Sequence, residues 1–128
     1  MSLLLDTHVF AWLFLDDPRL PKRISALLEA YESDIYVSAI SGYEMAQKLR
    51  FGKWAEARPL VEHFNRLTLE AHFLMLDVTP QHAIRAGLIP GKHRDPFDRM
   101  LVAQSMIEGL RLISADHGLN RLGVRPVW

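Results

Sequence analysis

The stretch Leu3-Leu4-Leu5-Asp6-Thr7-His8 decides the fold, because a short apolar run is followed at once by an acid. Three consecutive leucines predict a strand buried on both faces, as in a parallel sheet. The following residues, Thr7–Leu15, are apolar nearly all round and predict a helix that is buried or covered by a partner. Leu110–Ala115 is a second apolar run, and it ends at Asp116. We therefore expect both acids at the carboxyl edge of one sheet.

Strand-like and helix-like segments alternate along the chain, with no linker between them. This pattern predicts a single α/β domain, residues 1–128, with helices on both faces of a mostly parallel sheet of four to five strands. Ala55–Ala71 predicts one long amphipathic helix. The predicted strands are Leu3–Leu5, Ile35–Val37, Phe73–Val78, Arg111–Ser114 and, as a fifth, Val124–Val127.

Composition indicates a globular protein. Of 128 residues, 49% are hydrophobic, enough for one domain to bury roughly two-thirds of its unfolded surface. Fifteen basic and fifteen acidic residues give a net charge of zero, so any contact with nucleic acid must come from local basic patches. The absence of cysteine excludes disulfides and thiol chemistry. The longest early apolar stretch, Val9–Leu15, is too short to span a bilayer, and we expect a cytoplasmic protein.

Two further acids are expected at the same edge of the sheet. Glu44 lies near the start of a helix that follows Asp34–Ser38, and Asp98 lies one turn into a helix that begins at Asp95-Pro96. Several carboxylates at short range cannot all stay ionised unless a cation lies among them. Hard oxygen ligands in this number suit Mg²⁺ or Mn²⁺, which activate water for attack on a phosphodiester.

Each acid also has a purely structural interpretation. Asp6 and Asp95 stand where they would cap helices, and Ser41-Gly42-Tyr43-Glu44 has the spacing of a capping box. Asp98 suits the positive end of a helix dipole, and Asp116 stands where a turn begins. Independent caps would not need to fall on one edge of the sheet, so the metal site is the better joint interpretation.

Basic residues flank these acids and predict a cationic rim that would hold a polyanion over the metal. The alternative is ordinary solvated helix ends, with weak pairs four residues apart. The histidines have no zinc-ligand spacing, although His8 and His93 lie near the predicted crevice. The flanking residues of this predicted rim are Lys48, Arg50, Lys53, Lys92, His93, Arg94 and Arg99.

Several motifs occur together and in order: Leu4–His8, Val37–Ser41 leading to Tyr43–Lys48, His93–Arg99, Ala103-Gln104 and Ser114–Asp116. Together they resemble the PIN-domain family, and within it the VapC-like toxins of bacterial toxin–antitoxin pairs. The resemblance covers the whole chain, and His93–Arg99 is its most specific part. It implies a three-layer α/β/α fold and a Mg²⁺- or Mn²⁺-dependent endoribonuclease, which a small antitoxin inhibits and which usually forms a homodimer.

By motif position, the resemblance implies a quartet of catalytic and metal-binding acids, Asp6, Glu44, Asp98 and Asp116. Asp95 is a further ligand candidate. Two other functions stay open: a phosphatase with an aspartyl-phosphate intermediate, which His8 disfavours because a second aspartate is usual there, and a catalytically silent module that binds RNA or peptide. The candidate substrate-binding residues are Arg94, Arg99, Lys48, Ser114 and His8.

Overall fold

Four parallel strands form the central sheet, in the order β3-β2-β1-β4. The structure is a computed structural model that describes all residues from 1 to 128. Strand β1 pairs with β2 on one side and β4 on the other, so its three leucines lie inside the sheet and are buried. Because all pairing is parallel, the four carboxyl ends share one edge. The strands are β1 (Leu3–Leu5), β2 (Ile35–Ser38), β3 (Leu74–Leu76) and β4 (Arg111–Ile113).

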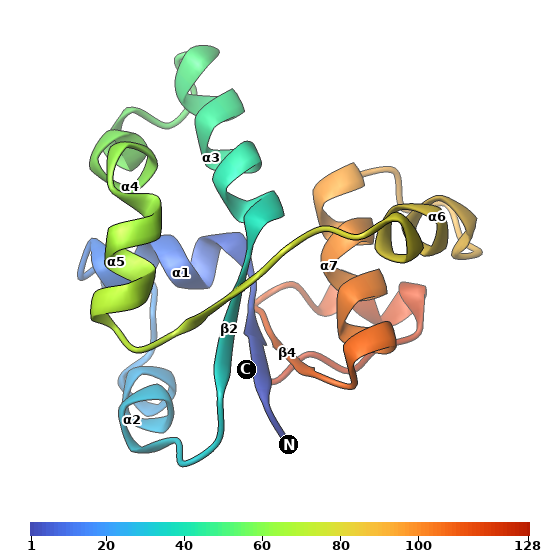
Figure 1. The fold of residues 1–128 in the computed structure, drawn as a ribbon, viewed down its shortest axis with the longest axis horizontal. Helices are drawn as coiled ribbons and strands as arrows, with labels where there is room; N and C mark the ends of the chain where they lie inside the picture. The colour runs from blue at the N-terminus through green and yellow to red at the C-terminus, as the bar shows by residue number, and fades with distance from the viewer.

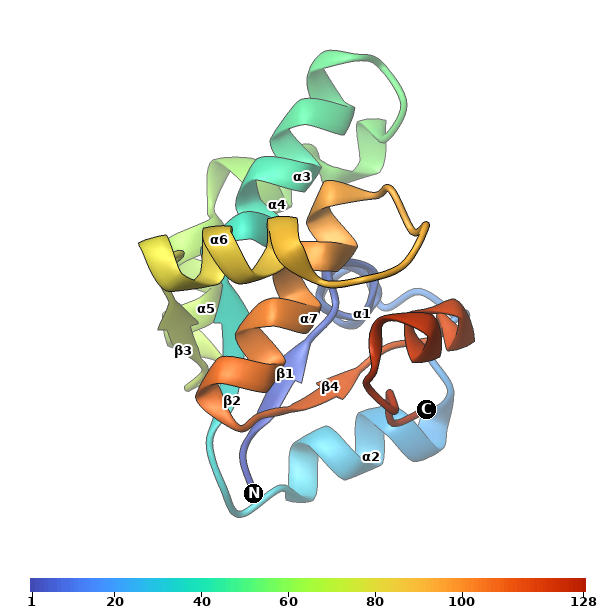
Figure 2. The same ribbon diagram turned by 90° about the vertical axis from the view of Figure 1, so that its right-hand side faces the viewer.

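Helices cover both faces of this sheet, which confirms the predicted three-layer α/β/α fold (Figures 1 and 2). None of them combines the length and the apolar character that a bilayer-crossing helix needs. The helices are α1 (Thr7–Phe14), α2 (Lys22–Ala30), α3 (Ala39–Arg50), α4 (Arg58–Glu62), α5 (Phe64–Glu70), α6 (Pro80–Leu88) and α7 (Pro96–Glu108), with short 3₁₀ turns η1 (Ala55–Ala57) and η2 (His117–Leu122).

Two hydrophobic cores lie on opposite faces of the sheet, because successive side chains of a strand point in opposite directions. Leu3 and Leu5 face the core that α1, α2 and α4 cover, on the left in Figure 1. Leu4 faces the second core, under α6 and α7, which lie in front of the sheet in Figure 2. Burial on both faces explains why β1 is a run of leucines and not an alternating strand.

The predicted fifth strand is wrong. Residues 124–127 make only an isolated parallel bridge, between Ile113 and Val127. The Val127 N–H donates to the Leu112 carbonyl at 2.8 Å, and the Val127 carbonyl accepts from the Ser114 N–H at 3.1 Å. Pro126 has no N–H to donate, so the ladder does not extend.

The long helix predicted over Ala55–Ala71 is broken into η1, α4 and α5. Pro59 has no N–H for a bond to the preceding turn, and His63 has non-helical backbone angles of −123° and 23°. The break lets the Phe64 ring contact Phe10, with ring centroids 5.4 Å apart. Gly42 makes room for that ring, since a Cβ there would lie 2.9 Å from it. Tertiary packing therefore outweighs the helical pattern.

Candidate active site

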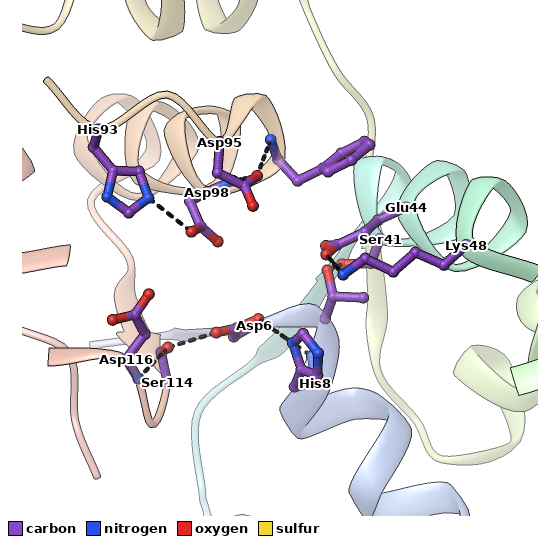
Figure 3. Close-up of polar contacts among 12 residues, drawn as sticks. Asp6, His8, Ser41, Glu44, Lys48, His93, Asp95, Asp98, Ser114 and Asp116 are labelled. Carbon is purple, nitrogen blue, oxygen red and sulfur yellow. Dashed lines mark hydrogen bonds and ion pairs between the residues drawn. The ribbon is translucent and has the colours of Figure 1, made fainter. Parts of the chain in front are cut away.

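The carboxyl edge of the sheet opens into a cavity of about 410 Å³. Its walls come from the segments that follow β1 and β4, from α3 and from the N-terminal end of α7 (Figure 3). Four segments that are distant in sequence thus place carboxylates around one hollow. The acids that line it are Asp6, Glu44, Asp95, Asp98 and Asp116.

Asp6 is the most firmly held of these acids. It caps α1 by accepting a hydrogen bond from the His8 N–H at 3.2 Å. The buried Ser114 hydroxyl donates to Asp6 Oδ2 at 2.5 Å and accepts from the Asp116 N–H at 3.0 Å. Burial raises the pKa of Asp6, although the Ser114 hydrogen bond acts in the opposite direction. Asp6 is therefore both the helix cap and a wall of the cavity, and Ser114 orients it.

Glu44 is free of the capping role that its spacing predicts, so the predicted capping box is wrong. Ser38 caps α3, accepting from the Ile40 N–H at 3.1 Å. Ser41 shares a buried hydrogen bond of 2.9 Å with Thr7 instead. Glu44 is only 3% exposed, and the Lys48 ammonium lies 2.6 Å from its Oε2 (Figure 3). The pair places a buried carboxylate at the edge of the cavity with a basic partner beside it.

Asp98 carries a carboxyl group that the cavity destabilises when it is charged. Asp95 caps α7, accepting from the N–H groups of Phe97 and Asp98. Burial, with smaller contributions from the charges of Asp95 and Asp6, raises the pKa of Asp98 to about 6. His93 opposes this shift, because its Nε2 lies 2.8 Å from Asp98 Oδ2. An anionic cavity with a raised carboxyl pKa is one that a cation would stabilise.

One group of side chains is spaced closely enough to hold a metal ion together. One ligand atom from each of His93, Asp98 and Asp116 lies within 4.8 Å of the others. Asp116 is exposed, and its Oδ1 accepts from the Gly118 N–H at 2.8 Å, which leaves Oδ2 available. Together with Asp6 across the cavity, this donor set is mainly carboxylate, which fits a hard divalent cation.

The predicted cationic rim is only partly present. Lys48 and His8 line the cavity. Arg94 is exposed and lies with Lys92 on a separate hollow beside it. Arg99 turns away from the acids, and its guanidinium donates to the backbone carbonyls of Ala86, Ile89 and His93. Arg99 therefore holds the loop that carries His93 and Asp95.

A model of the PIN domain family matches residues 3–124, nearly the whole chain. The chain belongs to the PIN-domain family. The family assignment made from the sequence motifs is thereby confirmed. Because the family match begins at β1 and extends beyond β4, it includes every acid that lines the cavity of this PIN domain.

Known proteins match this PIN domain over nearly its whole length. Ribonuclease VapC22 of Mycobacterium tuberculosis (strain ATCC 25618 / H37Rv) is 29% identical over 120 residues, 93% of this chain and 90% of that protein. FitAcB from Neisseria gonorrhoeae has a TM-score of 0.74 at 23% identity and covers 100% of this chain and 97% of its own. A toxin–antitoxin complex from Klebsiella pneumoniae has a TM-score of 0.60 at 22% identity, and the match covers 91% of this chain and 88% of that one. At these identities the two solved structures support the fold.

The contacts that three residues make in the PIN domain's site could not be predicted from the sequence. His93 was expected near the crevice, but its contact with Asp98 depends on how the loop before α7 folds back. Trp12 lines the acid cavity, and Trp54 lines the adjoining hollow. The only sequence signal for Trp54 is an aromatic residue among lysines after α3, which is too common a pattern to single out.

The pKa of Asp98 predicts how the metal-free PIN domain responds to pH. In the folded state the pKa is raised from 3.8 to about 6, so between these values the folded protein holds a proton that the unfolded chain has released. This contribution makes the folded state more stable as the pH falls through about 6. Urea unfolding in EDTA should show Asp98→Asn to be more stable than wild type at about pH 7.5, with the difference shrinking at about pH 5. An equal difference at both values would contradict the assignment.

Proposed function

We propose that this chain is an endoribonuclease that hydrolyses phosphodiester bonds of RNA and acts as the toxin of a toxin–antitoxin pair. The observation that carries the proposal is the single cavity onto which five carboxylates converge from four segments. A site of this charge suits divalent cations, which serve phosphodiester hydrolysis in many enzymes. The mycobacterial relative of similar length is named a ribonuclease, which supports the same reaction here.

Asp6, Asp98 and Asp116 are the residues that would hold a Mg²⁺ or Mn²⁺ ion, with Asp95 as a further ligand candidate. Such an ion supplies positive charge to the phosphate and activates a water as the nucleophile. Glu44 either orients the attacking water or contributes to the site of a second ion. All four acids of the quartet line the same cavity. Because the nucleophile would be a metal-activated water, no side-chain nucleophile is needed.

The chain's own contacts prepare the acids for these roles. Ser114 fixes one oxygen of Asp6, and His93 fixes one oxygen of Asp98, so the carboxylates are oriented before substrate arrives. The Lys48 ammonium binds Glu44 and lies where it can also attract a phosphate of the RNA backbone. Asp6 is a poor candidate for an aspartyl-phosphate nucleophile, because its oxygens accept from Ser114 and His8.

The proposed partners are a small antitoxin and a second copy of the chain, in the cytoplasm, where RNA is present. The neighbouring Klebsiella structure is a toxin–antitoxin complex, which supports a protein inhibitor. Helix α6 exposes Ile84 (64%) and Leu88 (74%) next to Met106 of α7, and this apolar hollow supports a protein interface. We propose that residues 1–128 act together as one ribonuclease domain.

Purified protein tests the proposal directly. We expect cleavage of RNA in Mn²⁺ or Mg²⁺ and none in EDTA, because EDTA removes the ion that would activate the attacking water. Each ion should also raise the melting temperature. At a concentration about 100 times its dissociation constant, a bound ion stabilises the folded state by about 2.7 kcal/mol. Calorimetric titration with Mn²⁺ provides a second measure of binding. Absence of both cleavage and Mn²⁺ binding would leave the catalytically silent RNA- or peptide-binding module as the function.

A further inference from the structure

A second hollow, of about 710 Å³, adjoins the acid cavity, and we call it the Trp54 groove. The two hollows share His8 and Lys48 in their walls, so one polymer chain can occupy both. Figure 3 shows these two side chains beside Asp6 and Glu44. The Trp54 groove is lined by His8, the loop Leu15–Arg19, Lys48, Lys53, Trp54 and Glu56.

An aromatic pair forms one wall of the Trp54 groove. The His8 imidazole stacks on the Trp54 indole, with ring centroids 4.9 Å apart and planes 22° from parallel. The His8 side chain is 45% exposed, Trp54 is half-buried and both line the groove, so part of the pair is accessible from it. Aromatic side chains stack with nucleobases of any nucleotide sequence, because every base has a flat π-face. The wall therefore suits a base.

Three acids and three basic residues line the groove, so it has no net positive charge to draw a phosphate into its interior. Asp16, Asp17 and Glu56 line it, and only Asp17 is paired, with Arg19 at 2.8 Å. Carboxylate oxygens repel phosphate oxygens but accept hydrogen bonds from the amino groups on base edges. The part of an RNA chain that fits here is thus the neutral base.

The phosphate that belongs to this base has a place at the border between the two hollows. The Lys48 ammonium lies 5.5 Å from the Trp54 ring centroid and 2.6 Å from Glu44 Oε2, so it faces both hollows. Lys53 is exposed on the same rim. An ammonium at this border attracts the backbone, while the aromatic wall contacts the base.

We propose that the Trp54 groove binds the base of a nucleotide adjacent to the scissile phosphate in single-stranded RNA. The inference rests on the proposed ribonuclease function, since the acid cavity is what holds the scissile phosphate. A base in the groove is out of any duplex stack, so the groove selects unpaired nucleotides next to the cleavage point.

Trp54→Ala, Trp54→Phe and Phe51→Ala together test the groove. Phe51 is the matched control, because it is an exposed aromatic residue close by in sequence that does not line the groove. The probe is an oligoadenylate of about 12 nucleotides with 2-aminopurine at one position, and binding is measured in EDTA so that no cleavage occurs. Anisotropy gives the affinity, and quenching of the 2-aminopurine emission reports stacking.

We expect Trp54→Ala to weaken binding about 5- to 100-fold and to abolish the quenching, the effect of losing one stacked base. Trp54→Phe keeps a flat ring and should fall between wild type and Trp54→Ala. Phe51→Ala should bind within about twofold of wild type. Because Trp54 also packs against a core, melting temperatures are compared, and Trp54→Phe decides the matter if Trp54→Ala unfolds.

Cleavage by wild type in Mn²⁺ separates the two possible failures. If wild type cleaves RNA, and Trp54→Phe and Trp54→Ala bind and quench like Phe51→Ala, the groove proposal is overturned and the ribonuclease function stands. If wild type neither cleaves nor binds RNA, the proposed function is overturned and the groove proposal falls with it. A selective loss in the Trp54 variants, with an increase in KM and little change in kcat, supports both.

Discussion

We expect Asp98→Asn to lower metal-dependent RNA cleavage by more than about 100-fold. Loss of a residue that only supports a metal ligand costs about 10- to 100-fold in affinity or activity, so loss of a ligand costs more. Asp98 has a ligand atom within 4.8 Å of those of His93 and Asp116, at the most closely spaced part of the cavity. Asparagine has the same shape but carries no negative charge and offers one acceptor oxygen fewer.

The same substitution leaves the fold intact, which distinguishes a lost ligand from a damaged protein. The N-terminus of α7 is capped by Asp95, so Asp98 is not needed to begin the helix. Its charge is unfavourable in the metal-free protein, as the pKa of about 6 shows. Asp98→Asn is therefore at least as stable as wild type in EDTA at neutral pH.

Asp34→Asn is the matched control for Asp98→Asn. Asp34 is exposed and lies just before β2, at the opposite edge of the sheet from the acid cavity. The two substitutions are chemically identical, and Asp34→Asn should cleave RNA within about twofold of wild type. Initial rates on one RNA at saturating Mn²⁺ measure the effect. Wild-type cleavage by folded Asp98→Asn would refute the role of Asp98.

The parts of this fold that follow from the sequence are those that depend on local pattern. Three leucines are long enough only for a strand, and an acid directly after it must lie at the carboxyl edge of a parallel sheet. Asp6 and Asp116 are placed by this argument alone. Asp95-Pro96 likewise begins α7, because aspartate caps helices and proline suits the first turn.

The parts that sequence did not predict depend on contacts between distant residues. Ser38 and Ser41 are both suited to cap α3, and the choice is decided by the bond from Ser41 to Thr7, 34 residues away. Arg99 has the sequence context of a substrate contact, but the end of α6 and the loop after it place three backbone carbonyls around its guanidinium. Local pattern contains no information on either contact, and for this reason the Trp54 groove was also missed.

Phe10→Ala is expected to give the largest loss of stability, about 3–5 kcal/mol in the free energy of unfolding. The ring of Phe10 is fully buried on α1, with its centroid 4.7 Å from that of Phe14 and 5.4 Å from that of Phe64. Removing it leaves a cavity between α1 and α5 that the surrounding structure fills only in part. Domains of this size are stable by about 5–15 kcal/mol in total, so urea denaturation should show a much lower midpoint.

Leu69→Ala is the control, because Leu69 lies on α5 on the same side of the sheet but is 64% exposed, and its loss should change stability by no more than about 0.5 kcal/mol. Equal losses in the two variants would refute the assignment of Phe10 to the core. Cleavage per folded molecule should be near wild type in Phe10→Ala at low temperature, since the acids are held at the ends of β1 and β4 and by α3 and α7. The two variants thus separate stability from activity: Phe10→Ala should lose stability and keep activity, and Asp98→Asn should lose activity and keep stability.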